Sequence, residues 1–546
     1  MKMLQKNQIT ILFTCIGRRV ELLEAFRSAA FDLSIDLTII GTDASSTVPT
    51  FSYCDKSYTV CRIDNQEYIP TLKRIVQENH VDLIIPTIDT DLLILAEHRD
   101  AFIALGSNIL VSDKDKIQIC RDKRLTHSFF AECGVSTPHT VDDVKDYQNG
   151  FPCFIKPKNG SSSIYAYKVI TRSQLLEKAQ EVPEYIIQPF IKGTEYTVDV
   201  FCDFSGNPIH IIPRKRLLVR SGEVLVTEIC NDEKIISECR QIIRIFKPQG
   251  PLTIQLIRDE AGQDYYIEIN PRFGGGSPLS MKSGANSALS LLTLLATGSA
   301  DNSQTDVASA NGMVYSRFDH SVAVHANDSI PTISSFHELL PQLERMNVQG
   351  VILDLDDTLY AEKEYVKCGF LYLCDTEDCM KGEFERLWQF FEEGVAPIDN
   401  LLKEKGLYSE TLKKKLLTAY RYHVPTIHLY SGVLDFLREW RDCNPQNKLG
   451  LITDGRVEGQ NNKIDALAIR AEFEEIIITD ELAGFQGDVK RFRKPNPLAF
   501  QIMRERLGID YSQLVYIGDN PKKDFQAPLR LGMQVIQFSP EDGVYA

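Results

Sequence analysis

The stretch Tyr265-Tyr-Ile-Glu268-Ile-Asn270-Pro271-Arg272, followed by Phe273-Gly-Gly-Gly276, alternates apolar and polar residues as a β-strand does. Because side chains two residues apart in a strand point to the same face, Glu268 and Asn270 share one face. Both carry the oxygen ligands that Mg²⁺ takes when it also holds nucleotide phosphates. Pro271 ends the strand, and Arg272 then stands where an anion would lie. A solvent-facing strand is an equal alternative for these residues alone, so the upstream elements decide the interpretation.

Composition limits the class of protein. With 546 residues the chain is too long for one hydrophobic core, and we expect two to four domains. A formal net charge of −15 argues against a nucleic-acid partner and against an anionic membrane. The 13 cysteines are scattered singly, so we expect reduced thiols and no zinc site. No apolar run reaches membrane-spanning length and no signal-peptide cleavage site is recognisable, so we expect a cytoplasmic protein.

The first 112 residues alternate short apolar runs with helical patterns, which predicts βαβ units and a parallel sheet. The turn after the first strand, Thr14–Arg19, lacks Gly-x-Gly-x-x-Gly, so dinucleotide binding is not expected. Ligands of such sheets bind at the carboxyl ends of the strands. Four residues at these ends are therefore candidates to bind a second substrate, with turn residues and helix caps as the alternative for each: Gly17, Arg18, Asp43 and Asp89.

A phosphate-binding segment is predicted after residue 153. Phe154-Ile-Lys156-Pro157 has the pattern of a strand with one inward lysine, and the small-residue loop Gly160-Ser161-Ser162 follows shortly after it. Backbone amides and hydroxyls of such a loop can bind phosphate oxygens, while the lysine neutralises them. Ordinary turns use the same residues, so the segment alone leaves both interpretations open.

Further residues complete a nucleotide site. An apolar strand ends in Gln188-Pro189-Phe190-Ile191, whose backbone can hydrogen-bond to an adenine edge. Glu195 follows in a position to accept hydrogen bonds from both ribose hydroxyls. Gln255, in the strand Thr253–Leu256, adds an oxygen ligand that can converge with Glu268 and Asn270.

In this order the elements resemble the ATP-grasp superfamily, especially the carboxylate–amine ligases related to carbamoyl-phosphate synthetase, over residues 1–325. The resemblance implies a Rossmann-like pre-ATP-grasp domain at 1–112 and an ATP-grasp domain at 113–325, whose two α+β subdomains clamp ATP. The implied ATP-binding residues are Lys123, Lys156, Gly160, Ser161, Ser162, Gln188, Pro189, Phe190, Ile191 and Glu195, and the implied Mg²⁺ ligands are Gln255, Glu268 and Asn270. Arg272 resembles the arginine that faces the acyl-phosphate, whereas Gln188 departs from the family's frequent Glu.

A basic run, Pro213-Arg214-Lys215-Arg216 with Arg220, is expected as a loop in which Arg214 and Lys215 close over the triphosphate. A solvated charge run is the alternative. The chemistry that such a site supports is activation of a carboxylate by the γ-phosphoryl group of ATP, followed by attack of an amine. The products are an amide, phosphate and ADP.

A second set of motifs begins with Gln349-Gly-Val-Ile-Leu-Asp354-Leu-Asp356-Asp357, an apolar strand that ends in three carboxylates. One Asp can attack phosphorus while the other protonates the leaving oxygen and later activates water. So many negative charges near a phosphate require a metal ion and a cation. The downstream strand ends and their loops supply a hydroxyl, a lysine and metal-ligating carboxylates: Thr453, Lys494, Asp519 and Asp524.

These motifs resemble the haloacid dehalogenase (HAD) superfamily over residues 348–546. The resemblance implies that Asp354 is the nucleophile and Asp356 the acid/base. It implies Mg²⁺ on Asp354, the Asp356 carbonyl and Asp519, with Asp524 nearby, and it implies that Thr453 and Lys494 hold the phosphoryl group. The helical segment from about 361 to 430 corresponds to a substrate-selecting cap. Four aromatic residues either line that cap or form its core: Tyr365, Trp388, Tyr420 and His423.

The sequence thus predicts a multidomain α/β and α+β enzyme in which a connector at 326–347 joins an ATP-grasp ligase to a HAD phosphatase. Both sites are expected to use Mg²⁺, and the first to use ATP. The expected partners are a small-molecule carboxylate and amine or a phosphorylated metabolite, and a homodimer is left open. A small-molecule kinase in place of the ligase, or a non-catalytic regulatory half, are the alternatives.

Overall fold

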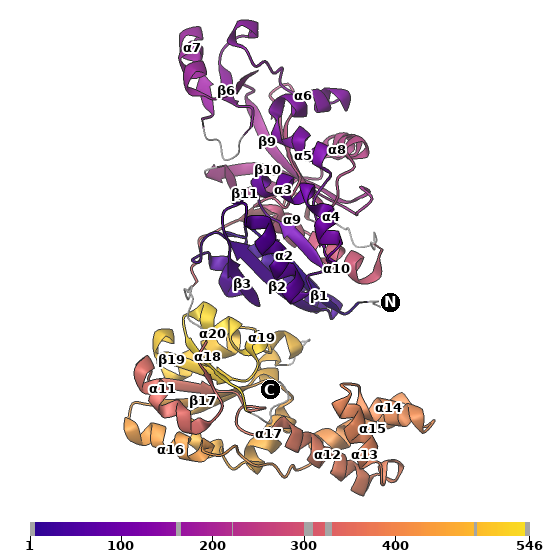
Figure 1. Cartoon of the computed structure of the whole chain (residues 1–546), viewed down its shortest axis with the longest axis vertical. Coiled ribbons are helices and arrows are strands. Elements are labelled where there is room, and N and C mark those ends of the chain that lie inside the picture. The colour runs from indigo at the N-terminus through magenta and orange to yellow at the C-terminus, as the bar shows by residue number, and fades with distance from the viewer. Residues whose placement is uncertain are drawn as a thin grey trace. The chain divides into compact units, whose positions relative to one another are not determined.

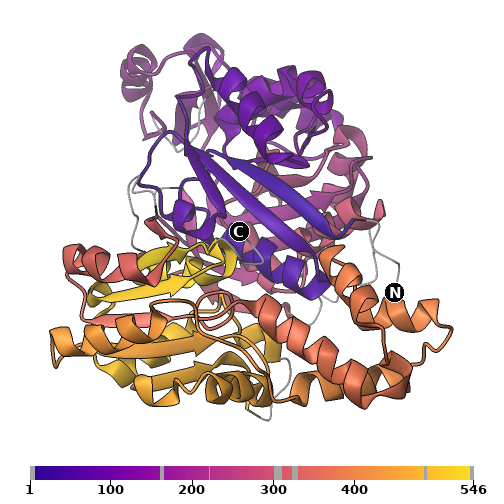
Figure 2. The same cartoon turned by 60° about the horizontal axis from the view of Figure 1, so that its bottom comes forward.

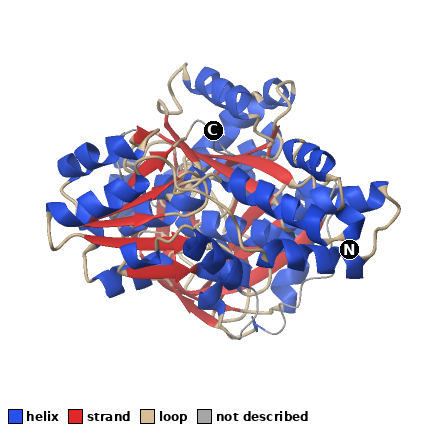
Figure 3. Ribbon diagram, turned by 90° about the horizontal axis from the view of Figure 1, so that it is seen from below, coloured by secondary structure: helices blue, strands red, loops and turns tan. Residues whose placement is uncertain are grey.

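The computed structural model describes residues 6–159, 165–220, 222–299, 310–322, 330–484 and 489–540. The chain divides into two compact units, Met1–Ser321 and Val322–Ala546 (Figure 1). Strands lie in layers among helices (Figure 3), and the sheets combine parallel and antiparallel arrangements, which confirms the predicted fold class.

The first unit opens with a five-stranded sheet in the order β3-β2-β1-β4-β5, and every neighbouring pair is parallel. Ile11, Leu12 and Phe13 are fully buried because β1 is the central strand and both of its faces are covered. Parallel strands bring the residues that follow β1 and β4 to one edge of the sheet. The elements are β1 (Gln8–Thr14), α1 (Val20–Leu33), β2 (Asp36–Asp43), β3 (Lys56–Thr59), α2 (Tyr68–Asn79), β4 (Leu83–Pro86), α3 (Asp89–Glu97), α4 (Arg99–Ile103) and β5 (Asn108–Ile109).

Two antiparallel sheets follow in the same unit. The smaller has the order β7-β6-β8, and the larger has the order β13-β12-β9-β10-β11-β14. Residues of α6 and α8 form one hydrophobic core with β9, β12 and β13, so these helices cover one face of the large sheet. The elements are α5 (Lys114–Arg121), α6 (Lys123–Glu132), β6 (Cys153–Pro157), β7 (Tyr167–Val169), α7 (Arg172–Glu181), β8 (Tyr185–Pro189), β9 (Gly193–Cys202), β10 (Pro208–Arg220), β11 (Glu223–Ile229), α8 (Glu233–Phe246), β12 (Pro251–Asp259), β13 (Asp264–Asn270), α9 (Ser277–Lys282), α10 (Ser287–Thr297) and β14 (Val314–Ser316).

The basic run from Pro213 to Arg216 is not the expected loop. It lies inside β10, which pairs with β9 on one side and β11 on the other. Its side chains therefore alternate between the two faces of the sheet, and only alternate residues can reach the same space.

The second unit contains a parallel six-stranded sheet in the order β15-β20-β19-β16-β17-β18. Val351 and Leu353 of β16 pack into one hydrophobic core, while Ile352 packs into a second core on the opposite face. This period of two with apolar residues on both faces is typical of a buried parallel strand. The elements are β15 (Thr332–Ile333), α11 (Leu339–Met346), β16 (Gly350–Leu353), α16 (Val433–Cys443), β17 (Lys448–Thr453), α17 (Val457–Ala466), β18 (Glu475–Ile478), α18 (Leu498–Leu507), β19 (Leu514–Gly518), α19 (Pro521–Asp524), α20 (Gln526–Leu531) and β20 (Gln534–Phe538).

Four helices between β16 and β17 form a cap with a hydrophobic core of its own. They lie together to one side of the sheet (Figures 1 and 2). The cap helices are α12 (Glu362–Thr376), α13 (Phe384–Glu392), α14 (Pro397–Glu404) and α15 (Glu410–Tyr422). In the described ranges, no helix has both the length and the apolar character needed to cross a membrane.

Candidate active sites

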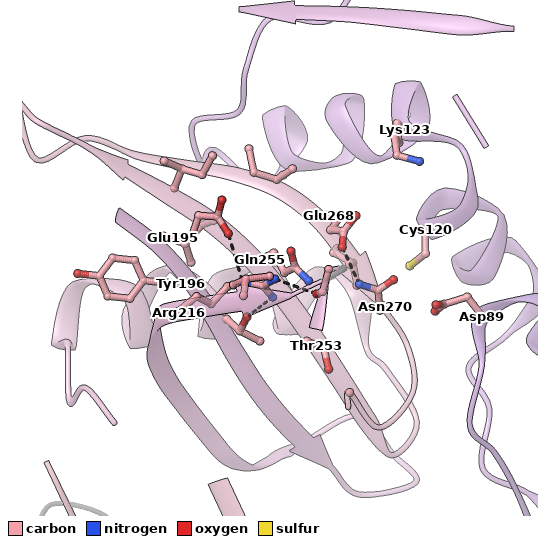
Figure 4. Close-up of a pocket in the computed structure, with 18 of the residues that line it drawn as sticks. Asp89, Cys120, Lys123, Glu195, Tyr196, Arg216, Thr253, Gln255, Glu268 and Asn270 are labelled. Carbon is pink, nitrogen blue, oxygen red and sulfur yellow. Dashed lines mark hydrogen bonds and ion pairs between the residues drawn. The ribbon is translucent and has the colours of Figure 1, made fainter. Parts of the chain in front are cut away.

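The first unit contains a cavity of about 970 Å³ (Figure 4). It is lined by β6, by strands β12 and β13 of the large sheet, and by the start of α3. Most of the residues predicted for the ATP site meet here: Lys123, Lys156, Gln188, Pro189, Phe190, Ile191, Glu195, Arg214, Gln255, Glu268, Asn270 and Arg272. The predicted Gly160, Ser161 and Ser162 lie outside the described residues.

The oxygen-bearing side chains come together through strand register. Gln255 on β12 lies directly opposite Glu268 on β13. The Asn270 amide nitrogen donates a hydrogen bond to a Glu268 carboxylate oxygen at 3.1 Å (Figure 4), which leaves the Asn270 amide oxygen as an acceptor. A half-buried carboxylate and two amide oxygens on adjacent strands fit a hard cation such as Mg²⁺.

Two lysines bring positive charge to the same cavity. Burial lowers the pKa of Lys156 to about 8, with Glu268 acting in the opposite direction and Lys123 adding to the lowering. Burial also lowers the pKa of Lys123, although Glu268 again opposes this effect. Both ammonium groups are therefore desolvated, with Glu268 as the carboxylate that acts on both, and an anionic phosphate chain would stabilise their charged forms.

The segment predicted to contact adenine is held by side chains on its flanks. The Gln188 amide donates a hydrogen bond to the Thr140 hydroxyl at 2.8 Å. The Phe190 ring stacks on Phe154 with 5.8 Å between centroids, and the Lys168 ammonium lies 3.8 Å from the Phe190 centroid. These contacts fix the end of β8 at the cavity wall.

Strand β10 presents Arg214 and Arg216 to the cavity, and Lys215 to the opposite face. The structure therefore does not bring Lys215 to the predicted ATP site: its ammonium pairs with Glu228 on β11 at 2.7 Å. Arg216, which was not among the predicted ATP ligands, lies there instead, with its Nε 3.2 Å from Glu195. Arg216 replaces Lys215 at the cavity because side chains two residues apart in a strand, here Arg214 and Arg216, point to the same face.

Arg214 is buried and oriented by one carboxylate. Its Nε donates a hydrogen bond to Asp199 at 2.7 Å, and Asp199 also accepts hydrogen bonds from Ser277 and Ser280. The Arg214 Nη1 atom is buried without a hydrogen-bond partner among the residues that the structure describes. A Cβ at Gly276 would lie 2.6 Å from Arg214 Nη2, so glycine lets the chain pass close to this guanidinium.

Arg272 faces the parallel-sheet domain. Its Nη2 donates a hydrogen bond to Asp89 at 2.7 Å, and Asp89 begins α3 just after β4. Arg19 also lines the cavity; burial lowers its pKa, and the nearby Arg272 acts in the same direction. The parallel sheet thus contributes one carboxylate and one guanidinium beside Arg272.

The other strand-end candidates do not line this cavity. Asp43 accepts a hydrogen bond from the Gly17 backbone amide at 2.9 Å, so these two residues stabilise a turn. Arg18 is exposed, and the next residue, Arg19, is the one that reaches the cavity. The sequence did not distinguish the two arginines because neither belongs to a periodic element.

The second unit holds a buried charge cluster at the carboxyl ends of β16 and β19. The Lys494 ammonium lies 2.7 Å from Asp354 and 2.6 Å from Asp524, and it donates a hydrogen bond to the Tyr516 hydroxyl at 2.8 Å. Burial opposes the charge on Lys494, but the two carboxylates raise its pKa well above the ordinary value. The two carboxylates thus favour the charged form of Lys494 beside Asp354.

Asp354, Asp519 and Asp524 are all buried, and each offers one carboxylate oxygen within 4.8 Å of the others. Burial, followed by the repulsion of Asp524, raises the pKa of Asp519 to about 7. A Cβ at Gly518 would lie 2.5 Å from an Asp524 oxygen, so glycine lets this carboxylate approach β19. Three converging carboxylate oxygens fit Mg²⁺.

Asp356 is not part of that cluster and accepts hydrogen bonds from three side chains. The donors are the Tyr360 hydroxyl at 2.5 Å, the Lys463 ammonium at 2.7 Å and the Gln460 amide at 2.8 Å. Burial opposes ionisation of Asp356, but Lys463 and these hydrogen bonds lower its pKa overall. Gln460 also donates to the Thr453 hydroxyl at 2.5 Å, which links the two predicted catalytic residues.

Lys463 and Gln460 were not predicted from the sequence. They lie three residues apart on α17 and so share one helix face, but only the fold brings that face to Asp356. Of the predicted cap aromatics, Tyr365 and Tyr420 line a small cavity of the second unit. Trp388 instead packs against Phe391 in the cap core, and His423 is buried against Tyr365.

Comparison with known families places three matches along the chain. A model described as "PylC-like, N-terminal domain" matches residues 11–110, "ATP-grasp in the biosynthetic pathway with Ter operon" matches 181–319, and "Haloacid dehalogenase-like hydrolase" matches 351–538. The chain therefore carries a PylC-like domain and an ATP-grasp domain in its first part, and a haloacid dehalogenase-like hydrolase domain in its second. Both predicted resemblances are confirmed.

Relatives of known function match one part or the other. Glyceraldehyde 3-phosphate phosphatase of Methanocaldococcus jannaschii is 26% identical over 209 residues, covering 35% of this chain and 85% of that protein. D-alanine--D-alanine ligase B of Clostridium perfringens is 23% identical over 248 residues, covering 38% and 78% respectively. Among solved structures, the L-amino acid ligase of Bacillus licheniformis has a TM-score of 0.45 and 18% identity, covering 62% of this chain and 85% of that one.

Proposed function

We propose that the protein is a bifunctional enzyme: an ATP-dependent ligase that joins a small carboxylate to an amine, and a phosphatase that acts on a phosphomonoester. The observation that carries the ligase half is the convergence of Glu268, Asn270 and two desolvated lysines on one cavity, with Arg272 beside them. The observation that carries the phosphatase half is the contact of Lys494 with Asp354 beside two more carboxylates.

In the ligase reaction, Lys123 and Lys156 bind the phosphate chain of ATP, and the end of β8 binds the adenine. Arg272, held by Asp89, faces the carboxylate that attacks the γ-phosphorus. The new bond joins a carboxylate oxygen to phosphorus, and the bond to ADP breaks. An amine then attacks the carbonyl carbon, and the acyl-phosphate oxygen leaves with phosphate. Mg²⁺ held by Gln255, Glu268 and Asn270 would neutralise charge on the phosphates.

In the phosphatase reaction, Asp354 attacks the phosphorus and Lys494 stabilises the equatorial oxygens. In the free enzyme Asp356 is ionised, because Lys463 and its hydrogen bonds lower its pKa. It takes up a proton when the substrate binds and donates that proton to the leaving oxygen, while Gln460 and Lys463 hold its carboxyl group in position. Asp356 then takes a proton from water, which hydrolyses the aspartyl-phosphate and regenerates Asp354. Mg²⁺ held by Asp354, the Asp356 carbonyl, Asp519 and Asp524 would offset the repulsion between the carboxylates and the phosphate.

A two-part assay tests this proposal. ADP release is measured with Mg²⁺, ATP and a panel of carboxylates, with and without a panel of amines, and phosphate release is measured with propyl phosphate. We expect ADP release to require a carboxylate, amide formation to require an amine as well, and phosphate release to need neither. Rapid ADP release with a stable phosphorylated product and no amide would contradict the ligase assignment.

A further inference from the structure

The second unit contains a small cavity of about 130 Å³ where the cap meets α17. The cap contributes α12 and the end of α15, and the core contributes the first turns of α17. The residues that line it are Tyr365, Tyr420, Arg421, Tyr422, Arg456, Glu458, Gly459, Gln460 and Lys463.

This cavity lies next to the proposed acid/base. Gln460 and Lys463 line it, and both donate hydrogen bonds to the Asp356 carboxylate, at 2.8 and 2.7 Å. Asp356 must contact the oxygen that leaves the phosphorus. The cavity is therefore within reach of the organic part of the substrate, which the leaving oxygen carries.

Two guanidinium groups meet at this cavity from different elements. Arg421 lies in the last turn of the cap helix α15, and Arg456 is the residue that precedes α17. Within the described part of the chain, neither has a carboxylate in an ion pair. Partial burial lowers the pKa of Arg421, and the neighbouring charge of Arg456 lowers it further.

The remaining lining residues of the cavity add one more positive charge, one negative charge and two aromatic walls. Lys463 adds a third positive charge, which Asp356 offsets at 2.7 Å. Glu458 brings one negative charge, and the Tyr365 and Tyr420 rings supply apolar walls. Two like charges brought together at a wall between cap and core are stabilised by an anion between them.

We propose that the phosphatase acts on a phosphomonoester with a second anionic group, and that Arg421 and Arg456 bind this group. The group is a carboxylate or a second phosphate, and the carbon chain that joins it to the transferred phosphate lies against Tyr365 and Tyr420. The inference rests on the proposed phosphatase function and adds the class of its substrate. It also assigns Arg421 and Arg456 as specificity-determining residues.

The test uses three phosphate esters with the same carbon chain: propyl phosphate, 3-(phosphonooxy)propanoate and propane-1,3-diyl bisphosphate. For each we consider the ratio of its kcat/KM to that of propyl phosphate. In the wild-type enzyme we expect a ratio of about 10 to 100 for at least one of the two anionic esters, as is typical of charge-assisted contacts. The ester with the higher ratio identifies the anionic group as a carboxylate or a phosphate.

The variants Arg421→Gln and Arg456→Gln should each reduce that ratio by about tenfold, chiefly through KM, because each removes one charged contact. Arg421→Lys should restore part of it. Arg438→Gln is the matched control, since Arg438 is an exposed arginine of the same unit that does not line the cavity, and it should keep the wild-type ratio.

A wild-type enzyme that hydrolyses all three esters equally well would overturn the inference while leaving the phosphatase assignment intact. The same conclusion would follow if the arginine variants lowered kcat/KM for all esters by one common factor, because the arginines would then act on the fold of the cap. A wild-type enzyme that hydrolyses none of the esters in Mg²⁺ would overturn the phosphatase assignment itself, and this inference with it.

Discussion

The two sites hold their charges in different ways. In the first unit, Lys123, Lys156 and Arg214 are desolvated around a wide cavity, and Arg214 retains a buried polar atom without a partner among the described residues. In the second unit, Asp354 and Asp356 already have a buried lysine each, Lys494 and Lys463. The first site thus depends on the ligand to complete its electrostatics, whereas the second is organised before the ligand binds.

The largest effect is expected at Asp354, the proposed nucleophile of the phosphatase. Asp354→Asn should lower phosphate-ester hydrolysis by at least about 10³-fold, because an amide cannot form the covalent intermediate. ADP formation by the same variant should stay near wild type, since Asp354 belongs to the other unit. Steady-state assays of both activities on one preparation check this, and a parallel loss of both would show that the sites are not independent.

The reverse comparison uses the ATP cavity. Glu268→Ala and Lys156→Ala should each lower Mg²⁺-dependent ADP formation by about 10²- to 10³-fold, because the first removes a proposed Mg²⁺ ligand and the second a cation that the phosphates require. Lys215→Ala is the matched control: Lys215 lies in the same sheet but pairs with Glu228 outside the cavity. An equal loss in Lys215→Ala would mean that β10 does not present its side chains as described.

Loss of a residue that positions Asp356 should lower the rate of hydrolysis less than loss of the proposed nucleophile. Lys463→Met should lower hydrolysis by about 10- to 100-fold, as is usual for residues that orient a reacting group. It should also raise the pKa of Asp356 and shift the pH–rate profile, because Lys463 opposes the effect of burial on that pKa. A uniform loss with an unchanged pH profile and a lowered melting temperature would point to a structural role only.

The sequence could predict those site residues that lie in or beside an element with a recognisable hydrophobic pattern. Alternation predicted the strand that carries Glu268, and a short apolar run predicted the strand that Asp354 follows. The prediction placed Lys215 at the ATP site and left out Arg216, because the basic run was interpreted as a loop. In a strand, the period of two puts Arg214 and Arg216 on one face. Lys463 and Arg19 could not be predicted, since their roles come from tertiary contacts that no local pattern encodes.

A smaller effect is expected from pH at the ATP site. Lys156 has a pKa of about 8 because it is buried, so it is charged below that pH and neutral above it. The kcat/KM for ATP should therefore fall as pH rises above about 8, since phosphate binding needs the charged form. Lys156→Arg should move this fall to higher pH. An unchanged profile in that variant would show that another group controls it.

The most direct test of the ligase assignment follows the oxygen atoms of the carboxylate substrate in Asp354→Asn, a variant whose second site is not expected to process phosphate esters. With an acid and an amine that support ADP release, the acid is labelled with ¹⁸O in its carboxylate. The ligase assignment predicts that one labelled oxygen appears in the released phosphate, because the oxygen that bridges carbon and phosphorus leaves with it. Label that stays wholly in the organic product, without amide formation, would contradict the ligase assignment and favour a kinase.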